Sequence, residues 1–115
     1  MLAPCPSSPN CVSTEATDPE HRIEPIPYTG SVDAARTRLL GVLKGMKRSR
    51  ILAAEGDVIL AEFVSLLWRF VDDAEFHFND GDKTIRLRSA SRIGYSDFGA
   101  NRRRMEEIRK KFQTP

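Results

Sequence analysis

The chain has 115 residues, of which 40% are hydrophobic and 30% charged, and this composition is typical of one globular domain with a modest core. No apolar run approaches the roughly 20 residues that a membrane helix needs, so we predict no membrane span. The N-terminus lacks a basic segment followed by an apolar stretch. We therefore expect a cytoplasmic protein as the sequence stands, and a periplasmic or membrane-associated one if the native N-terminus is longer.

The net charge of +2 hides an uneven distribution. Residues 1–82 contain 8 basic and 13 acidic side chains, whereas residues 83–115 contain 10 basic and 3 acidic ones. A positive segment of this kind can bind nucleic acid, an acidic partner or a phosphorylated ligand. It can equally well pair with the acidic part of the same chain.

Residues 1–20 are rich in Pro, Ser, Thr and Asn and contain few large apolar side chains. Prolines fix the backbone angle φ, so the segment is predicted to be irregular but stiff. We expect it to be an arm that packs on a single α+β domain formed by residues 21–115.

The arm contains both cysteines, Cys5 and Cys11. A disulfide between them is sterically easy, although it would not persist in a reducing cytoplasm. Zinc would need four ligands, and His21 and His77 are the only histidines; because the spacing matches no common zinc pattern, we predict no metal or other cofactor. A catalytic thiol would need a lowered pKa, which a sequence does not show. We favour a structural arm whose thiols can pair under oxidation.

Residues 21–28 predict a strand at a sheet edge, because Pro25 and Pro27 each lack a backbone donor. Ser31 then suits the N-cap of a helix over residues 31–46. Its apolar residues fall on one face at helical spacing: Val32, Ala35, Leu39, Val42, Leu43 and Met46.

From Arg50 onward the apolar period changes to two, which predicts strands. Residues 50–55 form the first, and Gly56-Asp57 suits a turn. Residues 58–68 have apolar side chains at both odd and even positions, so both faces of a strand would be apolar. We therefore predict a central, well-buried strand, with a short helix as the alternative.

Residues 69–94 predict a β-hairpin around Asp80-Gly81. This turn fixes a register with two apolar and two oppositely charged pairs: Phe76 with Ile85, Ala74 with Leu87, Glu75 with Arg86, and Asp73 with Arg88. The same register sets Asp72 opposite Ser89, and Arg92 opposite Arg69 with no acidic partner.

A helix is predicted to close the chain, capped by Ser96 or Asp97. Met105, Ile108 and Phe112 form its apolar stripe. Four ion pairs at i,i+4 spacing are expected on its surface: Arg102–Glu106, Arg103–Glu107, Glu106–Lys110 and Glu107–Lys111.

The predicted order is therefore strand, helix, four strands, helix. Such an order favours an α+β fold in which an antiparallel sheet has its helices on one face. The TATA-binding-protein-like and helix-grip folds share this order, and that analogy implies no function.

Three ordered stretches, CPSSPNCVS, DPEHRIEPIPY, and FVDDAEF followed by RSASRIGYSDFGANRRRMEEIR, resemble the domain of unknown function 1499 family of bacteria and plant plastids. The resemblance runs from Cys5 to about Arg109 and implies no established reaction. Many relatives look as if they carry a leader or membrane segment before the cysteine motif. The matching positions are Cys5, Pro6, Ser7, Ser8, Pro9, Asn10, Cys11, Asp72, Asp73, Arg88, Ser89, Ser91, Arg92, Gly94, Tyr95, Ser96, Asp97, Asn101, Arg102 and Arg104.

A polar cluster in the second half of the chain is the candidate ligand site. Arginine guanidinium groups match carboxylate and phosphate geometry. Asp72 is predicted to point to the core side of its strand, where a carboxylate needs polar partners. A purely structural role is the alternative reading, and we favour it for Asp72 and Arg88. The predicted ligand-binding residues are Asp72, Arg88, Arg92, Tyr95, Asn101, Arg102 and Arg104.

The function that these patterns favour is a non-enzymatic binding or accessory domain for a small anion or an acidic protein partner. A thiol-dependent enzyme that uses Cys5 or Cys11 is the alternative. Nucleic-acid binding is the weakest hypothesis, because the aromatic residues of the basic segment are scattered rather than arranged for base stacking.

Overall fold

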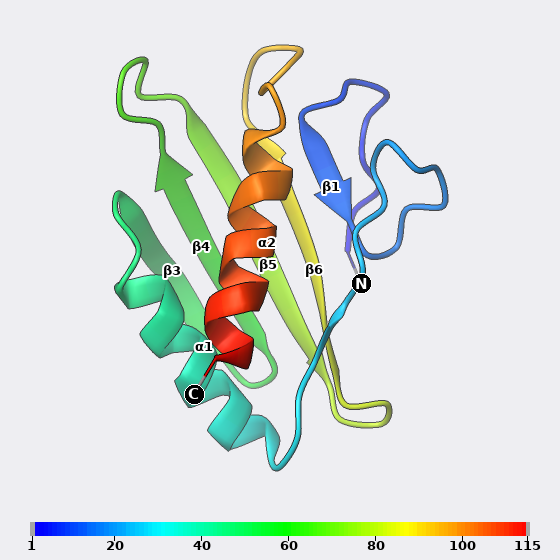
Figure 1. The fold of residues 1–115 in the computed structure, drawn as a ribbon, viewed down its shortest axis with the longest axis vertical. Coiled ribbons are helices and arrows are strands. Elements are labelled where there is room, and N and C mark those ends of the chain that lie inside the picture. The colour runs from blue at the N-terminus through cyan, green and yellow to red at the C-terminus, as the bar shows by residue number, and fades with distance from the viewer. Residues whose placement is uncertain (1, 115) are drawn as a thin grey trace.

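A six-stranded antiparallel sheet with both helices on one of its faces forms the fold (Figure 1). The computed structural model describes residues 2–114. Strands β1 and β2 both pair with β6, and the sheet continues from β6 through β5 and β4 to β3. The elements in chain order are β1 Cys11–Ser13, β2 Ile26–Pro27, α1 Val32–Lys44, β3 Ser49–Glu55, β4 Val58–Val64, β5 Val71–Asn79, β6 Thr84–Ser91 and α2 Ala100–Gln113.

The predicted fold class and the order from β2 to α2 are confirmed, and the one element missing from the prediction is β1. Cys11, Val12 and Ser13 pair with β6 and are all buried, so this part of the arm extends the sheet. Three residues between prolines give too short a pattern to show strand periodicity. The division into an arm of residues 1–20 and a domain of residues 21–115 stays a prediction.

The first helix is capped as predicted. The side chain of Ser31 accepts a hydrogen bond from the backbone N–H of Ala34 at 3.1 Å. Ala35, Leu39 and Leu43 are buried against the sheet, and Gly45 ends the helix. This places the basic turn that follows, Lys47-Arg48, at the edge of the helix layer.

Strand β4 is confirmed as a strand, but it ends at Val64 rather than at Trp68. Leu66, Leu67 and Trp68 lie in an exposed loop. The helices cover only one face of the sheet, so β4 alternates between buried and partly exposed positions instead of being buried on both sides. The central strand is β5.

The register predicted for the hairpin is wrong by two residues. Phe76 pairs with Leu87, Glu75 with Arg88, Asp73 with Ala90 and Asp72 with Ser91. The closing pair is Asn79 with Thr84, because the Asn79 side chain accepts hydrogen bonds from the Gly81 and Asp82 amides and holds a four-residue loop. A shift of two preserves which face each side chain occupies.

The C-terminal helix buries its predicted stripe of Met105, Ile108 and Phe112. The N-cap of α2 is Gly99 rather than the predicted Ser96 or Asp97, although Asp97, two residues earlier, accepts hydrogen bonds from the Gly99 and Asn101 amides. Of the four expected i,i+4 ion pairs, Glu107–Lys111 forms at 2.9 Å, whereas Glu106 pairs with Arg109 one turn on.

Candidate functional site

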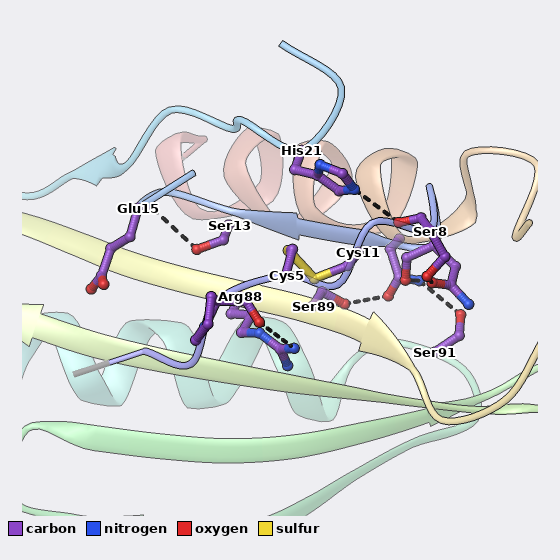
Figure 2. The surroundings of a disulfide bond; sticks show 12 residues. Cys5, Ser8, Cys11, Ser13, Glu15, His21, Arg88, Ser89 and Ser91 are labelled. Atoms are coloured by element: carbon purple, nitrogen blue, oxygen red, sulfur yellow. Dashed lines mark hydrogen bonds between the residues drawn. A yellow bond between two sulfur atoms is a disulfide. The ribbon is translucent and has the colours of Figure 1, made fainter. Parts of the chain in front are cut away.

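The N-terminal arm is closed by a disulfide between Cys5 and Cys11 (Figure 2). Cys11 lies in β1 and is fully buried opposite Ala90 of β6, so the bond fixes Cys5 to the edge of the sheet. While the disulfide is closed, neither sulfur is a thiolate, and the nucleophilic and metal-binding roles considered for the pair both require one.

His21 fixes the arm at a second point. Its Nδ1 lies 2.6 Å from Asp18 Oδ2, and its Nε2 lies 2.8 Å from the Ser8 carbonyl oxygen. The hydrogen bond to the Ser8 carbonyl raises the pKa of His21 against the opposing effect of burial, and the Asp18 carboxylate raises it further. In its protonated form the ring donates to both partners, so the charge of His21 holds the arm loop in place.

The other histidine lies elsewhere: His77 Nε2 is 2.5 Å from Glu75 Oε2 on β5. Within residues 2–114 there is no group of three or more His, Cys, Asp or Glu side chains that could hold a metal ion.

A buried hydrogen-bond network surrounds Asn101, one of the predicted site residues. Its Oδ1 accepts from Ser89 Oγ at 2.5 Å, and its Nδ2 donates to Asp97 at 2.7 Å, Ser91 at 3.0 Å and the Asn10 carbonyl at 3.3 Å. Burial raises the pKa of Asp97, but the hydrogen bonds from the Asn101 backbone and side chain outweigh it and leave the pKa lowered. The network joins the arm, β6 and α2.

Asp72 and Arg104 form a shielded ion pair beside this network. Arg104 Nη1 donates to Asp72 Oδ2 at 2.8 Å, and its guanidinium carbon lies 4.7 Å from the centre of the Phe63 ring. Because Ser91 pairs with Asp72 and also bonds Asn101, the three predicted residues Asp72, Asn101 and Arg104 are close together on the helix-covered face. Because Arg104 neutralises its carboxylate, Asp72 has the contacts expected of a structural residue.

Arg92 lies on the open face of the sheet and is not unpartnered, which corrects the expectation from the predicted register. Its Nε and Nη2 bind the two oxygens of Asp73 at 2.8 and 2.9 Å, and Nη2 also reaches Glu62 at 3.0 Å. The hydrogen bond to Asp73 raises the pKa of Arg92. This bidentate pair uses the guanidinium edge that an anionic ligand would need.

The remaining predicted residues lie apart from one another. Arg88 is on the open face under the arm, where it donates to the Pro4 carbonyl at 3.3 Å; its Nε is buried without a partner among residues 2–114 (Figure 2). Arg102 donates to the Glu20 carbonyl at 3.0 Å. Tyr95 is exposed in the loop before α2. Binding of a ligand by these residues stays a prediction.

The structure also shows a pocket that the sequence does not predict. It has a volume of about 470 Å³ and lies between the residues that follow α1, the end of β4 and one side of α2 from Ala100 to Lys111. Five cationic side chains and one carboxylate line it, together with Phe63, Val64 and Ser65 of β4 and the turn after it. The charged residues are Lys47, Arg48, Arg103, Arg104, Lys111 and Glu107.

The charges around this basic pocket do not cancel. Glu107 is neutralised by Lys111 at 2.9 Å, and Arg104 is paired with Asp72. Among residues 2–114, no carboxylate forms an ion pair with the other three cations, Lys47, Arg48 and Arg103. Arg48 Nε donates to the Val64 carbonyl at 3.1 Å, and Arg103 Nη1 donates to the Phe98 carbonyl. Backbone carbonyls thus orient two guanidinium groups and leave their other N–H groups available to an anion.

Of the seven predicted ligand residues, only Arg104 lines the basic pocket. Lys47 and Arg48 were overlooked because they lie in a turn more than 50 positions before α2, and no periodicity links the two segments. The available signal was the pair of adjacent cations directly after a predicted helix, which tertiary packing brings to the basic run of α2.

Comparison with known proteins places the chain in a family. The family model described as "Protein of unknown function (DUF1499)" matches residues 1–112, so the chain belongs to that family. No curated protein and no solved structure matches it, and the analogy to TATA-binding-protein-like or helix-grip folds stays a prediction. Within residues 2–114 the structure has no helix long and apolar enough to cross a membrane.

Proposed function

We propose that this member of a family of unknown function is a binding domain for a small phosphate-bearing anion, which the basic pocket holds. The observation that supports the proposal is the charge imbalance: Lys47, Arg48 and Arg103 converge on one pocket without a carboxylate partner within residues 2–114. Like charges at such a site repel one another, and a bound anion relieves the repulsion while accepting their hydrogen bonds.

Each cation has a distinct role in this proposal. Arg48 and Arg103, held by backbone carbonyls, present planar donor groups to the phosphate oxygens. Lys47 contributes a flexible point charge. Arg104 is fixed by Asp72 on one side and borders the pocket on the other, so the buried ion pair positions the wall of the site.

The proposed activity is binding rather than catalysis. Among residues 2–114, Glu107 is the only carboxylate that lines the pocket, and it is paired with Lys111; no cysteine or histidine of this range lines it. General acid–base or nucleophilic chemistry needs a titratable group near the ligand whose charge is not already committed.

The test is a calorimetric titration of the protein with inorganic phosphate and pyrophosphate at low salt. Arg103→Gln is expected to weaken binding about tenfold or more, because a charge-assisted hydrogen bond contributes about 1.5–3 kcal/mol. Lys110→Gln is the matched control, since it removes one positive charge from the same helix outside the pocket. Equal weakening by both substitutions would show a diffuse charge effect and contradict a pocket.

A further inference from the structure

Three connections lie at the same end of the molecule. The turn of residues 45–48 leads into β3, residues 65–70 join β4 to β5, and residues 92–99 join β6 to α2. Strand pairing fixes their common location, because Ser49 pairs with Phe63, Val64 with Val71, and Asp72 with Ser91. Figure 1 shows the last two connections at the top of the molecule, and they begin close together, because the Arg92 amide donates to the Val71 carbonyl at 3.0 Å.

The first apolar loop, residues 65–70, exposes four large side chains. Leu66, Leu67, Trp68 and Phe70 are between 46% and 76% exposed. Two hydrogen bonds close the loop at its base: the Ser65 amide donates to the Phe70 carbonyl at 2.8 Å, and the Phe70 amide donates to Ser65 Oγ at 2.9 Å. The backbone therefore holds these side chains away from the core.

The second apolar loop, residues 92–99, exposes three more large side chains. Ile93, Tyr95 and Phe98 are between 63% and 86% exposed. This loop is fixed as well, since the Asn10 side chain donates to the Gly94 carbonyl at 2.7 Å and Asp97 binds the amides at the start of α2. Seven exposed apolar side chains on two adjoining, anchored loops form an unusually apolar surface for a globular domain.

Positive charge surrounds this surface. Arg69 lies between Trp68 and Phe70 within the first loop, and Lys47, Arg48 and Arg103 line the basic pocket beside Ser65 at its base. The only acidic residue in the three connections is Asp97, whose carboxylate binds Gly99 and Asn101. Arg92, at the start of the second loop, is paired with Asp73 and Glu62, but Arg69 and the three unpaired cations of the pocket have no carboxylate partner within residues 2–114, so the surface combines apolar side chains with uncompensated positive charge.

We propose that this end of the protein docks on the surface of an anionic lipid bilayer, with the two apolar loops inserted at the level of the headgroups. The inference rests on the proposed function for one point: the anion that enters the basic pocket is the phosphate of a phospholipid headgroup. Apolar insertion and cation–headgroup contact together would hold the protein on the membrane.

The residue types in the two apolar loops favour a bilayer over a protein partner. Trp and Tyr suit the membrane interface, because their rings are apolar and their N–H and O–H groups can remain hydrated. The centre of a protein–protein interface is usually depleted of charge, whereas Arg69 lies among the apolar residues, from where its side chain can extend to the headgroups. Loops that project from the end of a sheet can also enter a soft surface without a complementary groove.

The fluorescence of Trp68 tests the proposal directly, because it is the only tryptophan in the chain. Mixed phosphatidylcholine–phosphatidylglycerol vesicles are expected to shift its emission to the blue and to co-sediment the protein, and pure phosphatidylcholine vesicles to bind at least tenfold more weakly. Raising the salt concentration should weaken binding to the mixed vesicles. If anionic vesicles at low salt produce no blue shift and do not co-sediment the protein, the proposal is overturned.

A matched pair of variants locates the contact. Leu66→Gln/Leu67→Gln should lower vesicle affinity at least tenfold, since each side chain loses its apolar insertion. Leu52→Gln/Leu60→Gln alters two exposed leucines on the open face of the sheet and should leave the affinity unchanged. Equal losses in the two variants would overturn the assignment to the loops.

The outcomes separate this inference from the proposed function. Phosphate binding that is preserved in Leu66→Gln/Leu67→Gln while vesicle binding is lost supports both. Phosphate binding by a protein that ignores anionic vesicles overturns the membrane inference alone. Vesicle binding that Arg103→Gln leaves unchanged overturns the assignment of the headgroup to the pocket. A blue shift that grows with protein concentration in the absence of lipid would show that a second copy covers the loops, and would overturn the bilayer as their occupant.

Discussion

At the scale of single residues, Asn101 shows how one side chain can join distant segments. Fully buried, it uses its carbonyl oxygen and both amide hydrogens to connect the arm, β6 and the start of α2. From the sequence, Asn101 is predicted to belong to the candidate ligand cluster. The structure gives it a set of protein partners, and a part in ligand binding stays a prediction.

Replacement of Asn101 by alanine is expected to lower the free energy of unfolding by about 1–3 kcal/mol, because Ser89 and Asp97 lose a buried hydrogen-bond partner. Gln113→Ala, on an exposed amide of the same helix, should change it by less than about 0.5 kcal/mol. Chemical denaturation of both variants measures the difference. An Asn101→Ala protein as stable as the parent would contradict the structural role of this network.

At the scale of elements, the sequence predicted those whose signals are local. Ser31 and the apolar face after it predicted α1 correctly, and Met105, Ile108 and Phe112 predicted the buried stripe of α2. The hairpin register was missed because it depends on the Asn79 side chain, which holds a loop of four residues rather than two. The position of β1 was missed because a three-residue strand has no pattern until its partner β6 is known.

The arm provides a prediction about pH. The folded state raises the pKa of His21, so its stabilising contribution is fully present below the unfolded pKa of about 6.5. The contribution is lost as the pH rises through the higher folded pKa. Asp18 does not titrate in this window, because its pKa is lowered from 3.8 by the hydrogen bond with His21.

Thermal unfolding followed across neutral pH measures this effect, as does hydrogen exchange at Ser13 and Ile23, whose amides bond the arm to residues 21–23. The parent should lose stability as the pH rises, and His21→Gln should remove most of that dependence. A variant with the same pH dependence as the parent would show that another group is responsible.

At the scale of the whole molecule, the charge segregation visible in the sequence is only partly neutralised by folding. Arg92 of the basic segment pairs with Asp73 and Glu62 of the acidic one, and Arg104 pairs with Asp72. The basic pocket collects cations from both segments, Lys47 and Arg48 from the first and Arg103 from the second. Its position could not be predicted from the sequence, because it exists only where the turn after α1 packs beside α2.

The central claim is that an anion binds in the basic pocket and not on the open face of the sheet, and a map of amide chemical-shift changes during titration with inorganic phosphate tests it most directly. We predict that the largest changes occur at residues 45–48, 63–65 and 100–107, around the pocket. Changes confined to residues near Arg88 and Arg92, or none at low salt, would contradict the account.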